Sequence, residues 1–227
     1  MLNGTEQNVA RETADDPRYQ RVRQQLVEAL LTLAAERPAE SISVSELTTA
    51  AGVSRAAFYG HATSPASLLA EILIEELRPG FEAVAVQMQQ PGADYIELWR
   101  QVYLNLLEHV AEHQGVYQVL TSRESAVSSA LTSFFERTAS VYVNAIEVQL
   151  VGMGDAELWR AMAITQQAHN MISVARAWIQ TGMAADPNTV VDTYLTLAPP
   201  WQLARADADG HISLRRSRSL GRSDRSK

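Results

Sequence analysis

The sequence predicts an all-α protein, with a small N-terminal three-helix domain followed by a larger C-terminal helical domain. Apolar residues recur at the helical spacing, for example at Val22, Leu26, Leu30 and Leu33. Proline and glycine separate such segments, and no stretch of useful length alternates between apolar and polar residues. We expect four parts in the chain: a disordered leader at 1–16, the three-helix domain at 17–63, the larger helical domain at 64–203 and a basic disordered tail at 204–227.

The composition excludes several classes of protein. The chain has 227 residues, 46% of them hydrophobic, which suits one or two helical domains with a sizeable core. Cysteine is absent, so disulfides and thiolate metal sites are excluded. No apolar run approaches the roughly 20 residues of a membrane-spanning helix, and the first residues lack a signal-peptide pattern. We therefore expect a cytoplasmic protein with no membrane partner.

The stretch 43–61 carries the most specific pattern in the chain. Ser43 and Ser54 each precede a short helical segment, where a hydroxyl can accept an orphan backbone N–H group. Glu46 follows Ser43 by three residues and completes a capping box. Gly52 lies between the two segments and tolerates the positive φ of a tight turn. Two short helices joined in this way are typical of a helix-turn-helix motif.

Residues 22–69 resemble the DNA-binding domain of TetR-type (tetracycline-repressor-like) transcriptional regulators. The residues that carry the resemblance are Ser43, Val44, Leu47, Ala50, Ala51, Gly52, Val53, Ser54, Phe58, Tyr59, His61, Leu68 and Leu69. The resemblance implies a homodimer that binds double-stranded DNA and a C-terminal domain that binds a small-molecule effector. It implies no cofactor.

The second helix of the motif is the expected recognition helix. In helix-turn-helix docking its early positions, here Arg55 and Ala56, face base edges in the major groove. Arg55 can bond guanine O6 and N7, and a phosphate or solvent contact is the alternative. By resemblance, Tyr59, His61 and the hydroxyls of Ser43 and Thr63 bond the phosphate backbone. The complete predicted DNA-binding set is Ser43, Val44, Ser54, Arg55, Ala56, Tyr59, His61 and Thr63.

The remaining segments are also expected to be helical. Predicted helices cover residues 18–36, 64–89, 94–113, a short segment to 121, 124–150, 155–182 and 187–197. Pro79 and Gly80 interrupt the second of these, so that helix either continues at a changed angle or ends there. Gly115 is expected to break the chain after residue 113, and Pro199 and Pro200 to end the last helix.

The C-terminal domain is expected to hold the effector site and the dimer interface. Apolar pockets with a few polar groups form between the helices of bundles, and by resemblance this pocket would hold a largely apolar effector. The candidate pocket residues are Trp99, Tyr103, Leu106, Phe134, Gln166, His169 and Asn170. The last two long helices carry small and apolar residues suited to a dimer contact, which are Ala161, Ala163, Ile164, Ala168, Met171, Ile172, Ser173, Ala175, Ala177, Val190, Val191, Tyr194 and Leu195.

Charge is distributed unevenly along a chain whose net charge is -7. Residues 18–61 contain five Arg and four Glu, whereas residues 212–227 contain six basic groups and one Asp. Most of the acidic charge therefore lies away from the helix-turn-helix, which is compatible with DNA binding.

Enzymatic and metal-binding patterns are weak. The sequence has no G-x-S-x-G, P-loop, G-x-G-x-x-G or H-E-x-x-H motif. His109 and His113 have the i, i+4 spacing of a helical metal pair, with Glu108 and Glu112 alongside. That spacing alone is weak, because a catalytic zinc needs a third ligand and an orienting shell. We therefore expect neither an enzyme nor a metal site.

The sequence favours a transcriptional regulator, expected to be a repressor that binds a palindromic operator as a dimer and is released by a small molecule. The alternative is a helical protein that binds a small molecule or a partner and whose DNA-reading end is weak or lost. It is motivated by Gly60, expected inside the recognition helix, and by Ala62 and Pro65. Those two stand where TetR-like proteins usually carry Phe and Lys.

Overall fold

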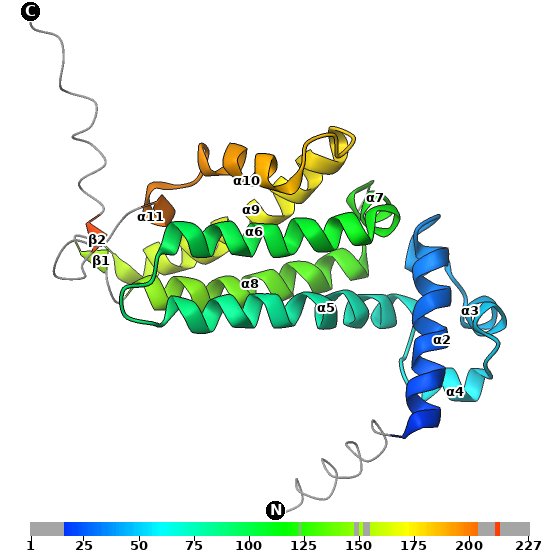
Figure 1. Cartoon of the computed structure of the whole chain (residues 1–227). Coiled ribbons are helices and arrows are strands. Elements are labelled where there is room, and N and C mark those ends of the chain that lie inside the picture. Colours follow the sequence, from blue (N-terminus) through cyan, green and yellow to red (C-terminus); the bar gives the residue numbers. More distant parts are fainter. Residues whose placement is uncertain (1–15, 123, 148–149, 152–154, 204–211, 214–227) are drawn as a thin grey trace, which may run out of the picture. The chain divides into compact units, whose positions relative to one another are not determined.

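The computed structural model describes residues 16–122, 124–147, 150–151, 155–203 and 212–213 (Figure 1). The α-helices are α2 (Pro17–Ala34), α3 (Val44–Ala51), α4 (Arg55–Tyr59), α5 (Pro65–Met88), α6 (Tyr95–Glu112), α7 (Gln114–Ser122), α8 (Ala126–Glu147), α9 (Ala156–Gln180), α10 (Pro187–Leu195) and α11 (Pro200–Leu203). A single 3₁₀ turn, η1 (Ala39–Ser41), precedes α3. The predicted all-α fold is confirmed.

Two very short strands supplement the helices. β1 (Leu150–Val151) pairs in parallel with β2 (Ile212–Ser213), with Leu150 opposite Ile212. The rest of the predicted tail at 204–227 lies outside the described residues, as does the predicted leader except Asp16, which caps α2. Among the described helices, none is long and apolar enough to cross a membrane.

The chain divides into two compact units. Unit 1 contains the described residues up to Ile74 together with His113–Ala130, and unit 2 contains Glu75–Glu112 together with the described residues from Leu131 onward. Each unit is built around its own buried apolar side chains.

Unit 1 is organised by α2, which packs against α3 and α7. The apolar stripe predicted for α2 is used here, since Leu26 and Leu30 are fully buried with Leu47 and Phe58 of the helix-turn-helix. The chain turns from α6 into α7 at His113 and not at Gly115, which lies inside α7. A Cβ at Gly115 would lie 2.8 Å from the Cβ of Ala35, so glycine permits close packing of α7 on the end of α2.

Unit 2 has an aromatic core between long helices. In sequence order its helices are the second part of α5, then α6, most of α8, α9, α10 and α11, and α6 packs against α9, α10 and α11 (Figure 1). Trp99, Tyr103 and Tyr142 are fully buried. The Tyr142 hydroxyl donates to the carbonyl of Phe81, 2.9 Å away, which ties α8 to α5.

Two expectations about helix ends are corrected. The alternative that the helix containing Pro79 ends there is wrong, because α5 continues through that proline to Met88. The chain also forms α11 directly after Pro199, beyond the last helix that the sequence predicts. Pro200 is the first residue of α11, a position where the missing proline N–H costs no hydrogen bond.

Candidate DNA-binding surface and effector site

The predicted helix-turn-helix forms in unit 1, and its caps are the predicted ones. The Ser43 hydroxyl accepts from the backbone N–H of Glu46, and the Ser54 hydroxyl accepts from that of Ala57, each at 3.1 Å. Gly52 ends α3 with φ of 67°, in the left-handed region that favours glycine. The Glu46 carboxylate pairs with Arg37, which fixes the start of α3 against the segment that follows α2.

The recognition helix α4 presents one apolar and one exposed face. Phe58 is completely buried, whereas Arg55 and Ala56 are exposed at the first two positions. The Tyr59 side chain is 57% exposed at the other end of the helix. Gly60 is the first residue after α4 and has an ordinary right-handed φ. The expectation that Gly60 lies inside the recognition helix is therefore wrong.

His61 lies partly inside unit 1. Its ring is stacked at 3.9 Å from the ring of Tyr19 on α2, and its Nδ1 is buried without a hydrogen-bond partner among the described residues. Burial, reinforced by the charge of Arg23, lowers the pKa of His61 below its ordinary value of 6.5. The imidazole is therefore mainly neutral at neutral pH.

The remaining predicted DNA-binding residues lie at the ends of helices. Ser43 and Ser54 are exposed and accept backbone N–H groups, which leaves their own hydroxyl protons available to a phosphate. Thr63 is exposed, and its hydroxyl is 3.1 Å from the Ser67 hydroxyl. Val44 is half-buried at the first position of α3. All eight predicted residues thus belong to the segment from Ser43 to Thr63 of unit 1.

The predicted effector residues separate into two groups. Four of them are packed into the closed core of unit 2, and three lie on α9 nearer the surface. The buried residues are Trp99, Tyr103, Leu106 and Phe134, and the α9 residues are Gln166, His169 and Asn170. The exposed ring of His169 faces a backbone carbonyl of its own helix, that of Thr165, at 2.8 Å from Nδ1. The seven residues therefore do not line a single open cavity.

A buried polar cluster joins α6, α9, α10 and α11 in this core. Gln167 donates to the Tyr103 hydroxyl at 3.3 Å and accepts from the Gln202 amide. The Tyr194 hydroxyl donates to Gln202 at 2.7 Å and accepts from Asn170 at 3.2 Å. The rings of Tyr103 and Tyr194 lie 4.1 Å apart. Burial raises the pKa of Tyr103 and of Tyr194, so both phenols stay neutral.

Trp201 of α11 fills the neighbouring space. Its ring is 5.6 Å from Trp99 and 5.8 Å from Trp159, in edge-to-face geometry in both cases. Its indole N–H points to the Gln166 amide oxygen at 3.4 Å. The indole N–H of Trp99 is buried and has no acceptor among the described residues. Such a donor in an apolar core is costly unless something supplies an acceptor.

Sequence reasoning missed Gln167, Trp201 and Gln202. Gln167 gave a usable signal, because it interrupts the stripe of Ala163, Ala168 and Met171 that is buried along α9. Trp201 and Gln202 gave none, since they follow two prolines and belong to a single helical turn.

An open apolar groove lies between α9 and α10. It has a volume of about 450 Å³, and Asn170 is the one predicted effector residue that lines it. Other lining residues are Val174, Trp178, Val190, Tyr194 and Leu197. The predicted interface residues are divided: Ala161, Ser173 and Ala177 are exposed, Ile164, Ile172, Val190 and Leu195 are half-buried, and Ala163, Ala168, Met171, Ala175, Val191 and Tyr194 are buried within unit 2. The buried members are therefore not available to a second subunit.

Comparison with known proteins identifies the N-terminal domain. Residues 26–72 match the family described as bacterial regulatory proteins, tetR family. No curated protein matches the chain in sequence.

Solved structures show the same fold over most of the chain. NalD of Pseudomonas aeruginosa, the secondary repressor of the MexAB-OprM multidrug efflux pump, is 17% identical with a TM-score of 0.59, over 79% of this chain and 95% of NalD. The fatty acid degradation regulator FadR of Bacillus halodurans is 17% identical with a TM-score of 0.57, over 81% and 95%. Bacillus subtilis FadR, in complex with stearoyl-CoA, is 14% identical with a TM-score of 0.54, over 77% and 96%.

Proposed function

The chain has the helix-turn-helix domain of the tetR family and the fold of its transcriptional regulators, and on this basis we propose that it is a DNA-binding regulator. It acts as a homodimer on a palindromic operator and represses until a small molecule binds. NalD, which has the same fold, is a repressor, and this supports the direction of control.

The observation that carries the proposal is the exposed face of α4. Arg55 and Tyr59 extend from opposite ends of a capped helix whose buried side is anchored by Phe58. Arg55 reads a guanine, and Tyr59 bonds a phosphate, which positions the helix without reading sequence. The two recognition helices of a dimer would then enter successive major grooves about 34–36 Å apart.

The test is binding to DNA from upstream of the protein's own gene, at about 50 and about 200 mM salt. Arg55→Ala should weaken binding to the preferred site by roughly 5- to 150-fold, as expected for 1–3 kcal/mol, and relax the preference at one base pair. Tyr59→Phe should weaken binding to all duplexes equally. The control is Arg137→Ala, an exposed arginine on α8.

Two results would contradict the proposal. If Arg55→Ala and Tyr59→Phe bind DNA as the wild type does, α4 is not the reading element. If the wild type also binds no genomic fragment better than a scrambled duplex, the alternative of a helical binding protein without operator recognition is favoured.

The buried polar cluster of unit 2 is the proposed effector site. Tyr103 and Gln167 offer neutral hydrogen-bonding groups next to aromatic rings. The buried indole N–H of Trp99, which has no acceptor among the described residues, offers a further donor. Charged ligands would be desolvated there without a buried counter-charge. The site therefore favours an uncharged, flat, largely apolar molecule that carries a hydrogen-bond acceptor.

Trp201 and Gln202 occupy this site in the structure described above. An effector would take their place, so its binding requires α11 to leave the core. The ligand and α11 then compete for the core. The ligand can shift the equilibrium between the states with α11 inside and outside the core only by the difference in its affinity for them. Binding of a ligand in the core would therefore be linked to the position of α11.

A matched pair of fluorescent probes tests the effector site. N-phenyl-1-naphthylamine is neutral, and 8-anilinonaphthalene-1-sulfonate has a similar ring system with a negative charge. Trp201→Ala should bind the neutral probe at least about tenfold more tightly than the wild type and discriminate against the sulfonate. Leu197→Ala is the control, because Leu197 lines the surface groove and not the core. A gain in Leu197→Ala alone would assign probe binding to the groove.

A further inference from the structure

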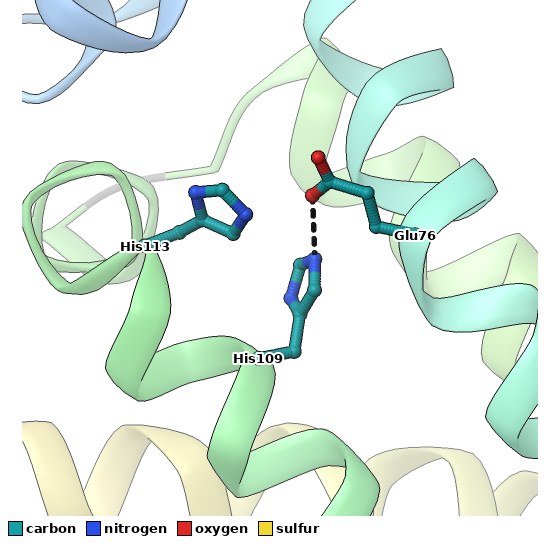
Figure 2. A group of neighbouring side chains, drawn as sticks. All are labelled: Glu76, His109 and His113. Atoms are coloured by element: carbon teal, nitrogen blue, oxygen red, sulfur yellow. Dashed lines mark hydrogen bonds and ion pairs between the residues drawn. The ribbon is translucent and has the colours of Figure 1, made fainter.

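Three potential metal ligands converge near the C-terminal end of α6 (Figure 2). They are Glu76, His109 and His113, and one ligand atom from each lies within 4.8 Å of the others. The sequence offers only the two histidines at helical spacing, whereas the structure supplies the carboxylate from α5. This third ligand is 33 residues from the nearer histidine and cannot be found by local pattern.

The arrangement depends on two local relations. Glu76 and His109 belong to the same unit, where Oε2 of the glutamate and Nε2 of the histidine are 3.1 Å apart. His113 is the first residue after α6, and it follows His109 by four residues, so both imidazoles emerge on one face of the chain. Figure 2 shows the His113 ring turned toward the other two side chains.

Burial distinguishes this group from a solvated surface pair. His109 is 7% exposed in an otherwise apolar helix face, His113 is half-buried, and Glu76 is 39% exposed at the side chain. A cation would thus be held on one side by a buried imidazole and would remain reachable from solvent beside the carboxylate. The group combines a preformed inner ligand with an entry path.

The donor set selects the kind of ion. Two imidazole nitrogens and one carboxylate oxygen suit Zn²⁺ and its neighbours Co²⁺ and Ni²⁺, whereas Mg²⁺ and Ca²⁺ prefer oxygen ligands. Tetrahedral zinc with ligand bonds of about 2.0–2.1 Å separates its donors by roughly 3.3 Å. Because the ligand atoms lie within 4.8 Å of one another, the side chains need to close by at most about 1.5 Å. Three protein ligands leave a fourth position for water.

We infer that Glu76, His109 and His113 form a binding site for a divalent transition-metal ion of the Zn²⁺ class. His109 is the inner ligand, Glu76 supplies the negative charge, and His113 completes the set. The inference is independent of the effector proposed for the aromatic core, because none of the three residues belongs to the Tyr103–Gln167–Gln202 cluster.

Calorimetric titration of Zn²⁺ into the tag-free, metal-stripped full chain tests this site. The wild type should bind one ion per chain with a dissociation constant on the order of micromolar or below. Glu76→Gln and His113→Ala should each weaken binding at least about tenfold, because each removes a direct ligand. His109 is left unchanged, since a variant at this buried residue tests folding as well as binding. The controls are Glu71→Gln on α5 and His169→Ala on α9, which are both exposed.

Thermal unfolding gives a second measurement that does not depend on calorimetric heats. Zn²⁺ should raise the melting temperature of the wild type and of both controls, and should leave that of His113→Ala unchanged. Visible absorption of the Co²⁺-loaded wild type should show the intense bands of a low-coordinate site. The inference is wrong if the wild type shows no saturable binding, or if Glu76→Gln and His113→Ala bind Zn²⁺ as tightly as the controls do.

Discussion

At the residue scale, serine caps stabilise the two short helices of the helix-turn-helix. The recognition helix α4 has five residues, so few of its backbone N–H groups can find partners within the helix. The Ser54 hydroxyl satisfies one of them, that of Ala57. A helix this short forms only because its ends and its buried Phe58 are held by the surrounding domain.

Ser54→Ala should therefore lower the free energy of unfolding by about 1 kcal/mol, with a range of about 0.5–2. Chemical denaturation followed by circular dichroism measures this change. Ser45→Ala is the matched control, because Ser45 is exposed inside α3 and does not cap a helix. An equal loss in both variants would show that the serine-to-alanine change itself, and not the cap, sets the cost.

His61 should make the stability of the protein depend on pH near 6.5. Burial and then the charge of Arg23 lower its pKa in the folded chain, whereas the unfolded chain keeps the ordinary value of 6.5. As pH falls through 6.5, the unfolded state takes up a proton first, so the free energy of unfolding decreases until the folded pKa is reached. Above this window His61 contributes no slope.

Denaturation at a series of pH values between about 5 and 8 measures the slope, and His61→Gln should flatten it near 6.5. Arg23→Gln should flatten it in part, because the Arg23 charge is the smaller of the two causes. An unchanged slope in His61→Gln would assign the pH dependence to other groups.

At the element scale, the sequence predicts most helices well where local chemistry marks their ends. Asp155 and Asp186 cap α9 and α10 by accepting the N–H groups of Leu158 and Thr189, and both helices begin within a residue of the predicted positions. Prediction fails for α11, because a single turn has too few residues for a periodic pattern and its stability comes from burial of Trp201. Proline alone does not decide where a helix ends, since Pro79 lies inside α5 and Pro200 is the first residue of α11.

Pro79→Ala should stabilise the protein. The proline lies inside α5 at an exposed position, and alanine would restore an N–H group there and improve helix propensity. A greater entropy of the unfolded chain offsets part of this gain, so we expect a net increase of about 1–2 kcal/mol in the free energy of unfolding.

The control for Pro79→Ala is Pro91→Ala, in the exposed turn between α5 and α6. That variant should lose about 0.4–1 kcal/mol, because only the unfolded chain changes. Thermal and chemical denaturation measure both variants. A destabilised Pro79→Ala would show that the proline-induced geometry of α5 is needed for packing of unit 2.

At the scale of the whole molecule, the fold class and the position of the helix-turn-helix follow from the sequence, but the arrangement of the proposed effector site does not. Trp99 and Tyr103 are correctly assigned to the interior of the C-terminal helices. The polar contacts of Tyr103 come from Gln167, which in turn accepts from Gln202, 35 residues further along the chain. Such long-range pairs leave no local signature. For the same reason, local pattern does not connect Glu76 with His109 and His113, which are more than 30 residues away.

The outer face of α9 is the surface that we propose for assembly of two subunits. Leu158 and Met162 are 58% and 64% exposed near its start, and Leu197 is 78% exposed after α10. Small residues on the same helix, Ala161 and Ala177, are also exposed and allow close approach of a second helix. An isologous interface on this face would bury these apolar side chains.

Met162→Asp should convert the proposed dimer to monomer at micromolar concentration. A twofold interface on this face would place the new carboxylates of both subunits in the same contact. Sedimentation velocity measures the change, and circular dichroism checks that the fold is retained. Val86→Asp is the matched control, since Val86 is 61% exposed on α5 of the same unit. A dimeric Met162→Asp would place the interface elsewhere. A monomeric wild type would exclude the symmetric operator, because two recognition helices at a fixed spacing require two joined subunits.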